Sequence, residues 1–205
     1  MSSSRLIAVV GGSGSGKSWI AARVGEWTGQ EVAHLCQDDF YRDLSHLPEH
    51  ERALVNFDDP EAIDWESLRE VLNALQQGRA AEMPVYDFST HTRLTAGRPF
   101  PPVEVVVLDG LWLLHHEWLR EKFSLSVFVD CPEEERLRRR IARDVLERGR
   151  TEESVRRQFA DHVQPMHAKF VEPQRRWATI CVGSPLTEKE HADLISACSA
   201  SSTNK

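Results

Sequence analysis

The stretch GGSGSGKS, residues 11–18, holds residue types that bind phosphate, at the spacing GxxxxGK[ST]. Its glycines let backbone N–H groups close around phosphate oxygens, and a helix that starts at its end adds a favourable dipole. Lys17 would reach the β- and γ-phosphates of a nucleotide, and Ser18 would hold Mg²⁺. A flexible Gly/Ser turn is the alternative, whereas the glycine spacing does not fit a dinucleotide fingerprint. The expected phosphate-binding residues are Gly11, Gly12, Ser13, Gly14, Ser15, Gly16, Lys17 and Ser18.

Carboxylates follow two apolar runs of strand length. Asp109 comes near the end of VEVVVLDG, residues 103–110, where an acid after a buried strand is expected to bind magnesium directly or through water. An Asp-Gly turn without a metal is the alternative. Asp38 and Asp39 follow EVAHLC, residues 31–36. One of this pair could accept a hydroxyl proton from a phosphoryl acceptor, and the other could face solvent or contact the metal. Two acids in a solvated turn are the alternative.

Seven arginines crowd one expected helix and its exit, namely Arg136, Arg138, Arg139, Arg140, Arg143, Arg148 and Arg150. Arg136, Arg140 and Arg143 are spaced i, i+4, i+7 and share a face, while Leu137 and Ile141 are expected to point to the core. In a chain of net charge -7, this is a local positive face of the kind that clamps a transferring phosphoryl group. An ordinary charged helix is the alternative, with these arginines paired to Glu133, Glu134, Glu135, Asp144 and Glu147.

The elements that must position these residues alternate between strand and helix. The predicted strands are 6–10, 31–36, 103–110, 125–130 and 178–183, and the predicted helices are 17–28, 63–77, 132–148, 152–171 and 188–197. This alternation predicts an α/β fold of the P-loop NTPase type, a parallel sheet with helices on both faces. The Pro-rich segment 79–102 breaks the rhythm and predicts an inserted β-hairpin lid. We therefore expect a single domain over 1–197 and a loose Ser-rich tail over 198–205.

Composition limits the classes of partner. The chain has 205 residues, of which 40% are hydrophobic, enough for one domain with a core. Its acidic balance argues against nucleic acid, and no apolar run approaches the roughly 20 residues that span a membrane. The first apolar run leads into the glycine loop, so it predicts a core strand rather than a signal peptide. The four cysteines are scattered and form no CxxC pair, which indicates free thiols in the reducing cytoplasm.

Several spaced motifs together resemble one known family. They are GGSGSGKS (11–18), QDDFYRD (37–43), NFDDPEAID (56–64), PVYDFSTHTR (84–93), RRRIARDVLERGRT (138–151) and QFADHVQPMHAKFVEPQRRWA (158–178). The chain is similar over roughly residues 5–182 to the uridine kinase (uridine–cytidine kinase) group of P-loop kinases. That group is related to phosphoribulokinase and nicotinamide riboside kinase.

The resemblance implies roles for individual residues. Asp38 stands at the position of the catalytic base, Asp58 at that of the ribose ligand, and Tyr86 and His91 at those of the contacts to the nucleoside base. Gln158 aligns with a residue near the nucleoside. The expected catalytic residues are Lys17, Asp38 and Arg143; Arg140 and Arg143 join the P-loop around phosphate; the substrate residues are Asp58, Tyr86, His91, Arg148, Arg150 and Gln158; the metal residues are Ser18, Asp38 and Asp109.

The implied activity is transfer of the γ-phosphate of ATP or GTP to the 5′-hydroxyl of a ribonucleoside, uridine or cytidine first, with Mg²⁺ as cofactor. The chain departs from the family at Asp39, Asp59 and Asp109, where the family usually has serine, histidine and glutamate. Kinases of nicotinamide riboside or of another small hydroxylated metabolite stay open, as does a non-catalytic nucleotide-dependent regulator. The resemblance also implies a homo-oligomer, a tetramer or a dimer.

Overall fold

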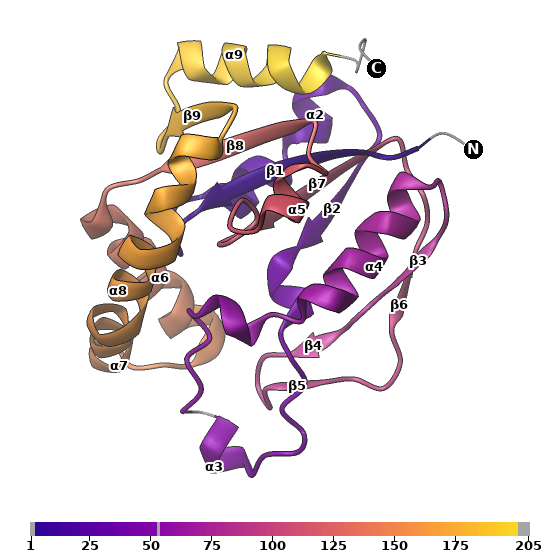
Figure 1. Cartoon of the computed structure of the whole chain (residues 1–205). Helices are drawn as coiled ribbons and strands as arrows, with labels where there is room; N and C mark the ends of the chain where they lie inside the picture. Colours follow the sequence, from indigo (N-terminus) through magenta and orange to yellow (C-terminus); the bar gives the residue numbers. More distant parts are fainter. Residues whose placement is uncertain (1–2, 53, 201–205) are drawn as a thin grey trace.

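The computed structural model describes residues 3–52 and 54–200 of the chain. Its centre is a five-stranded parallel sheet in the order β2-β7-β1-β8-β9 (Figure 1). The strands are β1 (Arg5–Gly11), β2 (Val32–Cys36), β7 (Val105–Gly110), β8 (Leu125–Asp130) and β9 (Ile180–Gly183). Helices cover both faces of the sheet, so the expected fold class is confirmed.

The central strand β1 is buried on both faces. Ile7 and Val9 pack into one hydrophobic cluster, while Leu6, Ala8 and Val10 pack into another on the opposite face. The first cluster is covered by α1 (Lys17–Ala21), α2 (Val24–Thr28) and α9 (Glu188–Ser199). The second is covered by α4 (Trp65–Gln76), α5 (Glu117–Arg120) and part of the helical run over 159–177. Two covered faces explain why the strand reads as a continuous apolar run.

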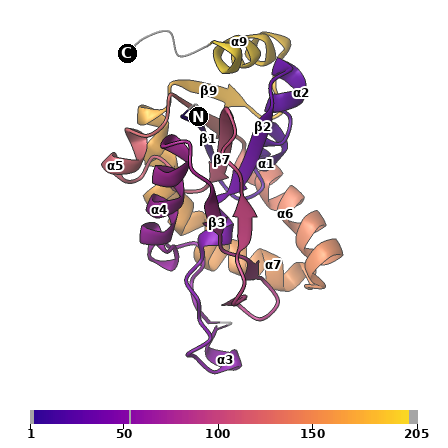
Figure 2. The ribbon, with the colours of Figure 1, turned by 90° about the vertical axis from the view of Figure 1, so that its right-hand side faces the viewer.

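Three of the remaining helices, α6 (Glu133–Arg148), α7 (Glu152–Gln158) and α8 (Gln164–Met166), lie at the end of the sheet where phosphate chemistry is expected. The short helix α3 (Glu49–Arg52) lies apart from the sheet, at the bottom of Figure 1. Figure 1 places α6 and α7 on the side of the molecule to which the arrow of β1 points, and Figure 2 shows both helices from a second direction. Ligands of open parallel sheets bind at this carboxyl edge.

The helix predicted over 152–171 is less regular than expected. It is α-helical to Gln158 and then contains two π-helical turns, 159–163 and 167–171, on either side of α8. Pro165 lies between these turns and has no N–H to donate to the carbonyl four residues before it, which disturbs the regular ladder.

Two other helix predictions differ in extent. The helix predicted over 17–28 is interrupted between Ala21 and Val24 and forms α1 and α2. The last helix, α9, ends at Ser199 rather than at residue 197, because buried Cys198 packs into the first hydrophobic cluster. The expected loose tail therefore begins inside a helix, and its residues 201–205 lie outside the described part of the chain.

The insertion over 79–102 forms a two-part antiparallel hairpin. Strand β3 (Ala81–Met83) pairs with β6 (Arg98–Phe100), and β4 (Tyr86–Asp87) pairs with β5 (Thr92–Arg93). Its buried residues Met83, Tyr86 and Phe100 join the second hydrophobic cluster. The predicted hairpin is present, and its action as a lid stays a prediction.

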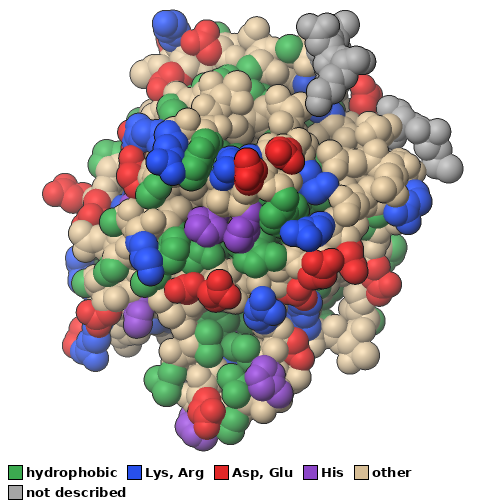
Figure 3. All heavy atoms as spheres, in the orientation of Figure 1, with side chains coloured by type: hydrophobic (Ala, Val, Ile, Leu, Met, Phe, Trp, Pro, Cys, Tyr) green, Lys and Arg blue, Asp and Glu red, His purple; other side chains and the backbone are tan. Residues whose placement is uncertain are grey.

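The surface mixes charges of both signs. On the face shown in Figure 3, Lys and Arg side chains lie next to Asp and Glu side chains, and neither sign forms a broad field. Basic groups that bind phosphate must therefore gather locally. Within 3–52 and 54–200, none of the helices has both the length and the apolar character needed to cross a membrane.

Candidate active site

The glycine-rich loop lies between the end of β1 and the start of α1. Gly14 and Gly16 have φ values of 80° and 94°, in the left-handed region that favours glycine. A Cβ atom at Gly14 would also lie 2.4 Å from the carbonyl oxygen of Arg136, so the loop and α6 approach too closely for a side chain there. Lys17 is the first residue of α1. The loop thus has the conformation and the position that the motif predicted.

Asp109 lies at the end of β7 with both carboxylate oxygens held. Ser18 Oγ donates a hydrogen bond to Oδ2 at 2.6 Å, and His34 Nε2 lies 2.7 Å from Oδ1. The side chain of Asp109 is fully buried. Burial raises the pKa of Asp109, but the hydrogen bond with His34, the charge of Lys17 and the hydrogen bond from Ser18 together lower it by more. The pKa of Asp109 is therefore below its ordinary value. The group is therefore an ionised carboxylate.

These residues fit a magnesium ion. A hydroxyl and a carboxylate oxygen of neighbouring elements are ligands that Mg²⁺ accepts, and it keeps several waters or phosphate oxygens besides. Among the described residues, no three or more His, Cys, Asp and Glu side chains form a metal cage. Ser18 and Asp109 would therefore hold the ion together with the nucleotide. The sequence prediction missed His34, although strand alternation puts it on the same face of β2 as Cys36, which is level with Asp109 in β7.

The two adjacent aspartates lie in a short 3₁₀ helix, Gln37–Phe40, directly after β2. Fully buried Gln37 fixes this turn, because its Oε1 accepts hydrogen bonds from the N–H groups of Leu111 and Trp112 at 2.9 and 3.0 Å. Asp38 lines the central cavity, whereas Asp39 does not. The structure therefore separates the pair, and no role was predicted for Gln37, although it begins the motif QDDFYRD.

The electrostatic environments of the two aspartates also differ. Burial raises the pKa of Asp38, against the lowering effect of the Lys17 charge, and nearby Asp109 raises it further. Burial also raises the pKa of Asp39, whose strongest opposing charge is Arg98 on the hairpin. Lys17 is the strongest opposing charge at Asp38, and both residues line the same cavity.

A cavity of about 850 Å³ opens at the carboxyl edge of the sheet and brings most of the predicted site together. From the predicted set, its walls contain Ser13, Lys17, Asp38, Asp58, Tyr86, His91, Arg140, Arg143, Arg148, Arg150 and Gln158. Ser18, Asp109 and the glycines of the loop are not among the lining residues. Ser18 adjoins Lys17 in sequence and donates a hydrogen bond to Asp109, so these two residues lie beside the cavity.

The inward face of α6 is polar rather than apolar. Its buried residues are Arg136, Arg140 and Asp144, whereas Leu137 and Ile141 are only half-buried, so the expectation that the two aliphatic residues point to the core was wrong. The reason is position: α6 packs beside the glycine-rich loop instead of on the sheet's hydrophobic face. There the helix needs groups that hydrogen-bond to the loop.

The arginines divide by what they contact. Arg140 donates to Ser13 Oγ at 2.7 Å and to Gln158 Oε1 at 2.9 Å, so it joins the glycine-rich loop to α7. Arg150 also donates to Gln158 Oε1. Arg136, although it was placed on the same helix face, does not line the cavity and donates from Nε to the carbonyl oxygen of Cys131 at 3.3 Å. Arg140, Arg143, Arg148 and Arg150 remain as the cationic wall of the cavity.

The opposite wall is aromatic and acidic. The ring of His91 stacks on that of Phe57, with centroids 4.5 Å apart and an interplanar angle of 18°. Asp58, which follows Phe57 in the chain, is buried. Burial raises the pKa of Asp58, and the charge of Arg140 acts in the opposite direction. The hydroxyl of Tyr86 and Nδ1 of His91 are buried without a hydrogen-bond partner in the described structure. Both residues line the cavity beside a stacking surface, but these two atoms have no exposed surface, so a ligand would bond to them only after a side-chain movement.

One hairpin residue, to which the motifs assigned no role, joins this wall to the Gln37–Phe40 turn that carries Asp38. Arg93 donates from Nε to the carbonyl oxygen of Tyr41 at 2.8 Å and from NH2 to that of Phe40 at 3.1 Å. Its NH1 pairs with Asp64 Oδ2 at 2.9 Å, and Asp64 is the N-cap of α4. The hairpin, the Asp38 turn and α4 are therefore fastened at a single guanidinium group.

Comparison with known proteins places this site in a family. The model of the phosphoribulokinase / uridine kinase family matches residues 6–189. A uridine kinase of Deinococcus deserti is 45% identical over 193 residues, covering 94% of this chain and 93% of the relative, and one of Lactococcus lactis is 37% identical over 100% of both chains. The structure of phosphoribulokinase from Rhodobacter spheroides has a TM-score of 0.66 at 17% identity, over 88% of this chain and 70% of that chain, a likeness of fold alone. The chain belongs to the phosphoribulokinase / uridine kinase family.

Proposed function

We propose that this protein is an ATP- or GTP-dependent nucleoside kinase that phosphorylates the 5′-hydroxyl of uridine or cytidine. The observation that carries the proposal is one cavity that holds Lys17 of the phosphate loop, the carboxylate of Asp38 and the polar aromatic wall of Tyr86 and His91. Relatives of known name over nearly the whole chain are uridine kinases, which supports the same acceptor class.

Each residue would contribute by its position. Asp58 would hold the ribose hydroxyls, and Asp38 would accept the 5′-hydroxyl proton as the oxygen attacks the γ-phosphorus. Lys17, Arg140 and Arg143 would stabilise the negative charge that spreads over the transferring phosphoryl group. Mg²⁺, held by Ser18 and Asp109, would neutralise charge on the β- and γ-phosphates.

The wall at Tyr86 and His91 suits a pyrimidine base. Burial and the charges of Arg148 and Arg52 lower the pKa of His91, so its imidazole is neutral near pH 7. A neutral imidazole and a phenol can each donate or accept a hydrogen bond. Position 4 of uracil is an acceptor and that of cytosine is a donor, so this pair of residues is compatible with both bases. Phe57 and His91 supply the aromatic surface.

Other properties follow only from the family likeness. We place the protein in the cytoplasm, with a nucleoside and a nucleoside triphosphate as its small-molecule partners and Mg²⁺ as its cofactor. A homo-oligomer, tetramer or dimer, and the absence of nucleic-acid and membrane partners belong to the same proposal. The preference between ATP and GTP is left open by the residues described above.

An acceptor panel tests the proposal. Uridine, cytidine, adenosine, nicotinamide riboside and ribulose 5-phosphate would each be incubated with ATP, Mg²⁺ and enzyme, and ADP release would be measured. Uridine and cytidine should give the highest kcat/KM, and Lys17→Ala should lower kcat by roughly 10²-fold or more, the scale of one lost electrostatic stabiliser. Preference for a non-pyrimidine acceptor would assign a different kinase. Phosphate transfer to none of them, with ATP still bound, would favour the non-catalytic regulator.

A further inference from the structure

Asp144 is a buried carboxylate surrounded by the four arginines of the cationic wall. Its side chain has no exposed surface, although it lies on a helix beside an open cavity. Oδ1 accepts a hydrogen bond from Arg143 Nε at 2.8 Å and lies 3.7 Å from Arg148 NH1. Oδ2 lies 3.5 Å from Arg140 Nε and 3.9 Å from Arg150 NH1. One acid is therefore shared by every arginine that lines the cavity.

The main chain of Asp144 holds the same group of residues. Its carbonyl oxygen accepts a hydrogen bond from the N–H of Gly149, the left-handed residue at which α6 ends, and from the N–H of Arg150 at 3.1 Å. Arg148 and Arg150 flank this turn. The residue thus fixes both the guanidinium groups and the stretch of chain that carries two of them.

The charge balance explains why a carboxylate is needed there. Four guanidinium groups within ion-pair distance of one point repel one another strongly at the reduced dielectric of a half-buried site. Asp144 offsets part of that repulsion and leaves this group of five residues with a surplus of three positive charges. It can do so without contacting a ligand, because its side chain is closed off from the cavity.

We infer that Asp144 is a positioning residue, which holds Arg140 and Arg143 where they receive the phosphates and Arg148 and Arg150 where they line the substrate side of the same cavity. The inference rests on the proposed function for its effect on kcat, but its effect on polyphosphate binding stands apart from the acceptor. The carboxylate gathers the guanidinium groups before substrate arrives, so that they need not reorganise during transfer.

The test is Asp144→Asn, which keeps the side chain's shape and removes its charge. We expect kcat to fall about 10- to 100-fold, the range found when a residue that orients metal-binding side chains is removed, and the KM for the nucleoside to rise as well because Arg148 and Arg150 lose their partner. Asp193→Asn, on the exposed face of α9, is the matched control and should behave as wild type. A folded Asp144→Asn enzyme whose kcat stays within twofold of wild type would overturn the inference.

A second readout needs no turnover. Without the carboxylate the four arginines repel one another, so the empty variant should melt at a lower temperature than wild type. Tripolyphosphate should then raise its melting temperature more than it raises that of wild type, because the anion takes over the missing charge. Equal shifts in both proteins would refute the inference, whatever the acceptor panel shows.

If Asp144→Asn is too unstable to purify, the inference can be tested by removing one positive charge as well. Asp144→Asn combined with Arg150→Gln removes one charge of each sign and should recover the melting temperature lost by the single change. The matched double variant Asp144→Asn with Arg157→Gln removes an exposed arginine outside the wall and should not. Recovery by both double variants, or by neither, would show that Asp144 serves packing and not the arginine group.

Discussion

His34 Nε2 and Oδ1 of Asp109 are 2.7 Å apart across two neighbouring parallel strands, β2 and β7. Together with Ser18 on the other oxygen, this contact leaves the buried carboxylate a single orientation. The aspartate stands where the family usually has the longer glutamate. A shorter acid reaches less far, so the proposed binding of Mg²⁺ would depend more strongly on the histidine that fixes the position of Asp109.

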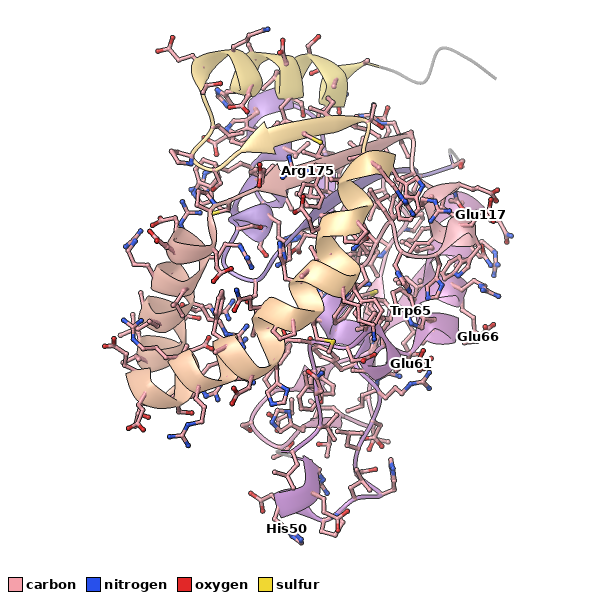
Figure 4. All side chains as sticks on the ribbon, turned by 60° about the vertical axis from the view of Figure 1, so that its left-hand side comes forward. His50, Glu61, Trp65, Glu66, Glu117 and Arg175 are labelled. Atoms are coloured by element: carbon pink, nitrogen blue, oxygen red, sulfur yellow. The ribbon has the colours of Figure 1, made fainter. Side chains whose placement is uncertain are left out.

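The first prediction concerns His34→Leu, which fills the space but cannot bond to Asp109. The Mg²⁺ concentration for half-maximal rate should rise about 10-fold, as for other groups that orient a metal-binding side chain. His34→Gln can still donate a hydrogen bond and should retain most of the affinity. His50, at the far end of the α3 segment in Figure 4, supplies the control variant His50→Leu. An unchanged Mg²⁺ requirement in His34→Leu would remove the histidine from the metal site.

The second prediction separates Asp38 from Asp39. Asp38→Asn keeps the size but removes the proton acceptor, so kcat should fall about 10²- to 10⁴-fold, the span of general-base catalysis, with a modest change in acceptor affinity. Asp39 does not line the cavity, so Asp39→Ser should keep activity within about tenfold. Steady-state kinetics with uridine would measure both. The reverse ranking would mean that the base is Asp39, and two active variants would mean that neither acid is the base.

The third prediction concerns the stability of the same Asp38→Asn variant without ligands. Because the folded-state pKa of Asp38 is raised above its unfolded value, folding favours the protonated form, and the group's contribution to stability falls as pH rises through the folded pKa. The variant should therefore melt at a higher temperature than wild type at pH 7. The difference should shrink at pH values below the ordinary aspartate pKa of about 3.9, where both states are protonated. Thermal melts of both proteins between pH 3 and pH 8 would check this, and a variant less stable at pH 7 would contradict it.

The fourth prediction concerns Arg93, whose side chain is only 19% exposed and makes three hydrogen bonds. Arg93→Ala should destabilise the fold by about 2 to 3 kcal/mol, since charged hydrogen bonds of this kind are lost together. It should also lower kcat, because the hairpin wall and the Asp38 turn are no longer fastened. Urea unfolding would measure the stability, with Arg79→Ala as control, an exposed arginine whose guanidinium group hydrogen-bonds to Gln77 two residues away. A stable, fully active Arg93→Ala enzyme would contradict the prediction that the contacts of Arg93 support the fold and the site.

The fifth prediction concerns the hairpin as a lid. Arg93 anchors β5 to the end of the turn that carries Asp38. Closure should therefore be confined to the hairpin tip at 87–91, which carries His91. Saturating uridine should slow amide hydrogen exchange at the tip, while β3 and β6 exchange as before. Exchange that is unchanged throughout 79–102 at verified saturation would identify a static wall.

The sequence by itself determined the fold class, the phosphate loop and the identity of most cavity residues. The fold class and the phosphate loop follow from local rules, because a glycine loop between an apolar run and a helix has few other solutions and alternating strands and helices form a parallel sheet. Asp58, Tyr86, His91 and Gln158 were indicated only by the resemblance to the uridine kinase group. The carboxyl edge of that sheet then brings Lys17 and Asp38 together, although they come from different elements.

Only the tertiary structure decided which polar groups support the site. His34 lies outside the motifs, and the motifs that contain Gln37, Arg93 and Asp144 indicated no role for these three residues. The role of each became visible from its contacts in the folded chain. The same holds for α6. Its buried face is polar because the helix packs against the glycine-rich loop, and only the folded structure shows this neighbour. Helical periodicity states which residues share a face, but the neighbour that the face meets is set by packing across the whole chain.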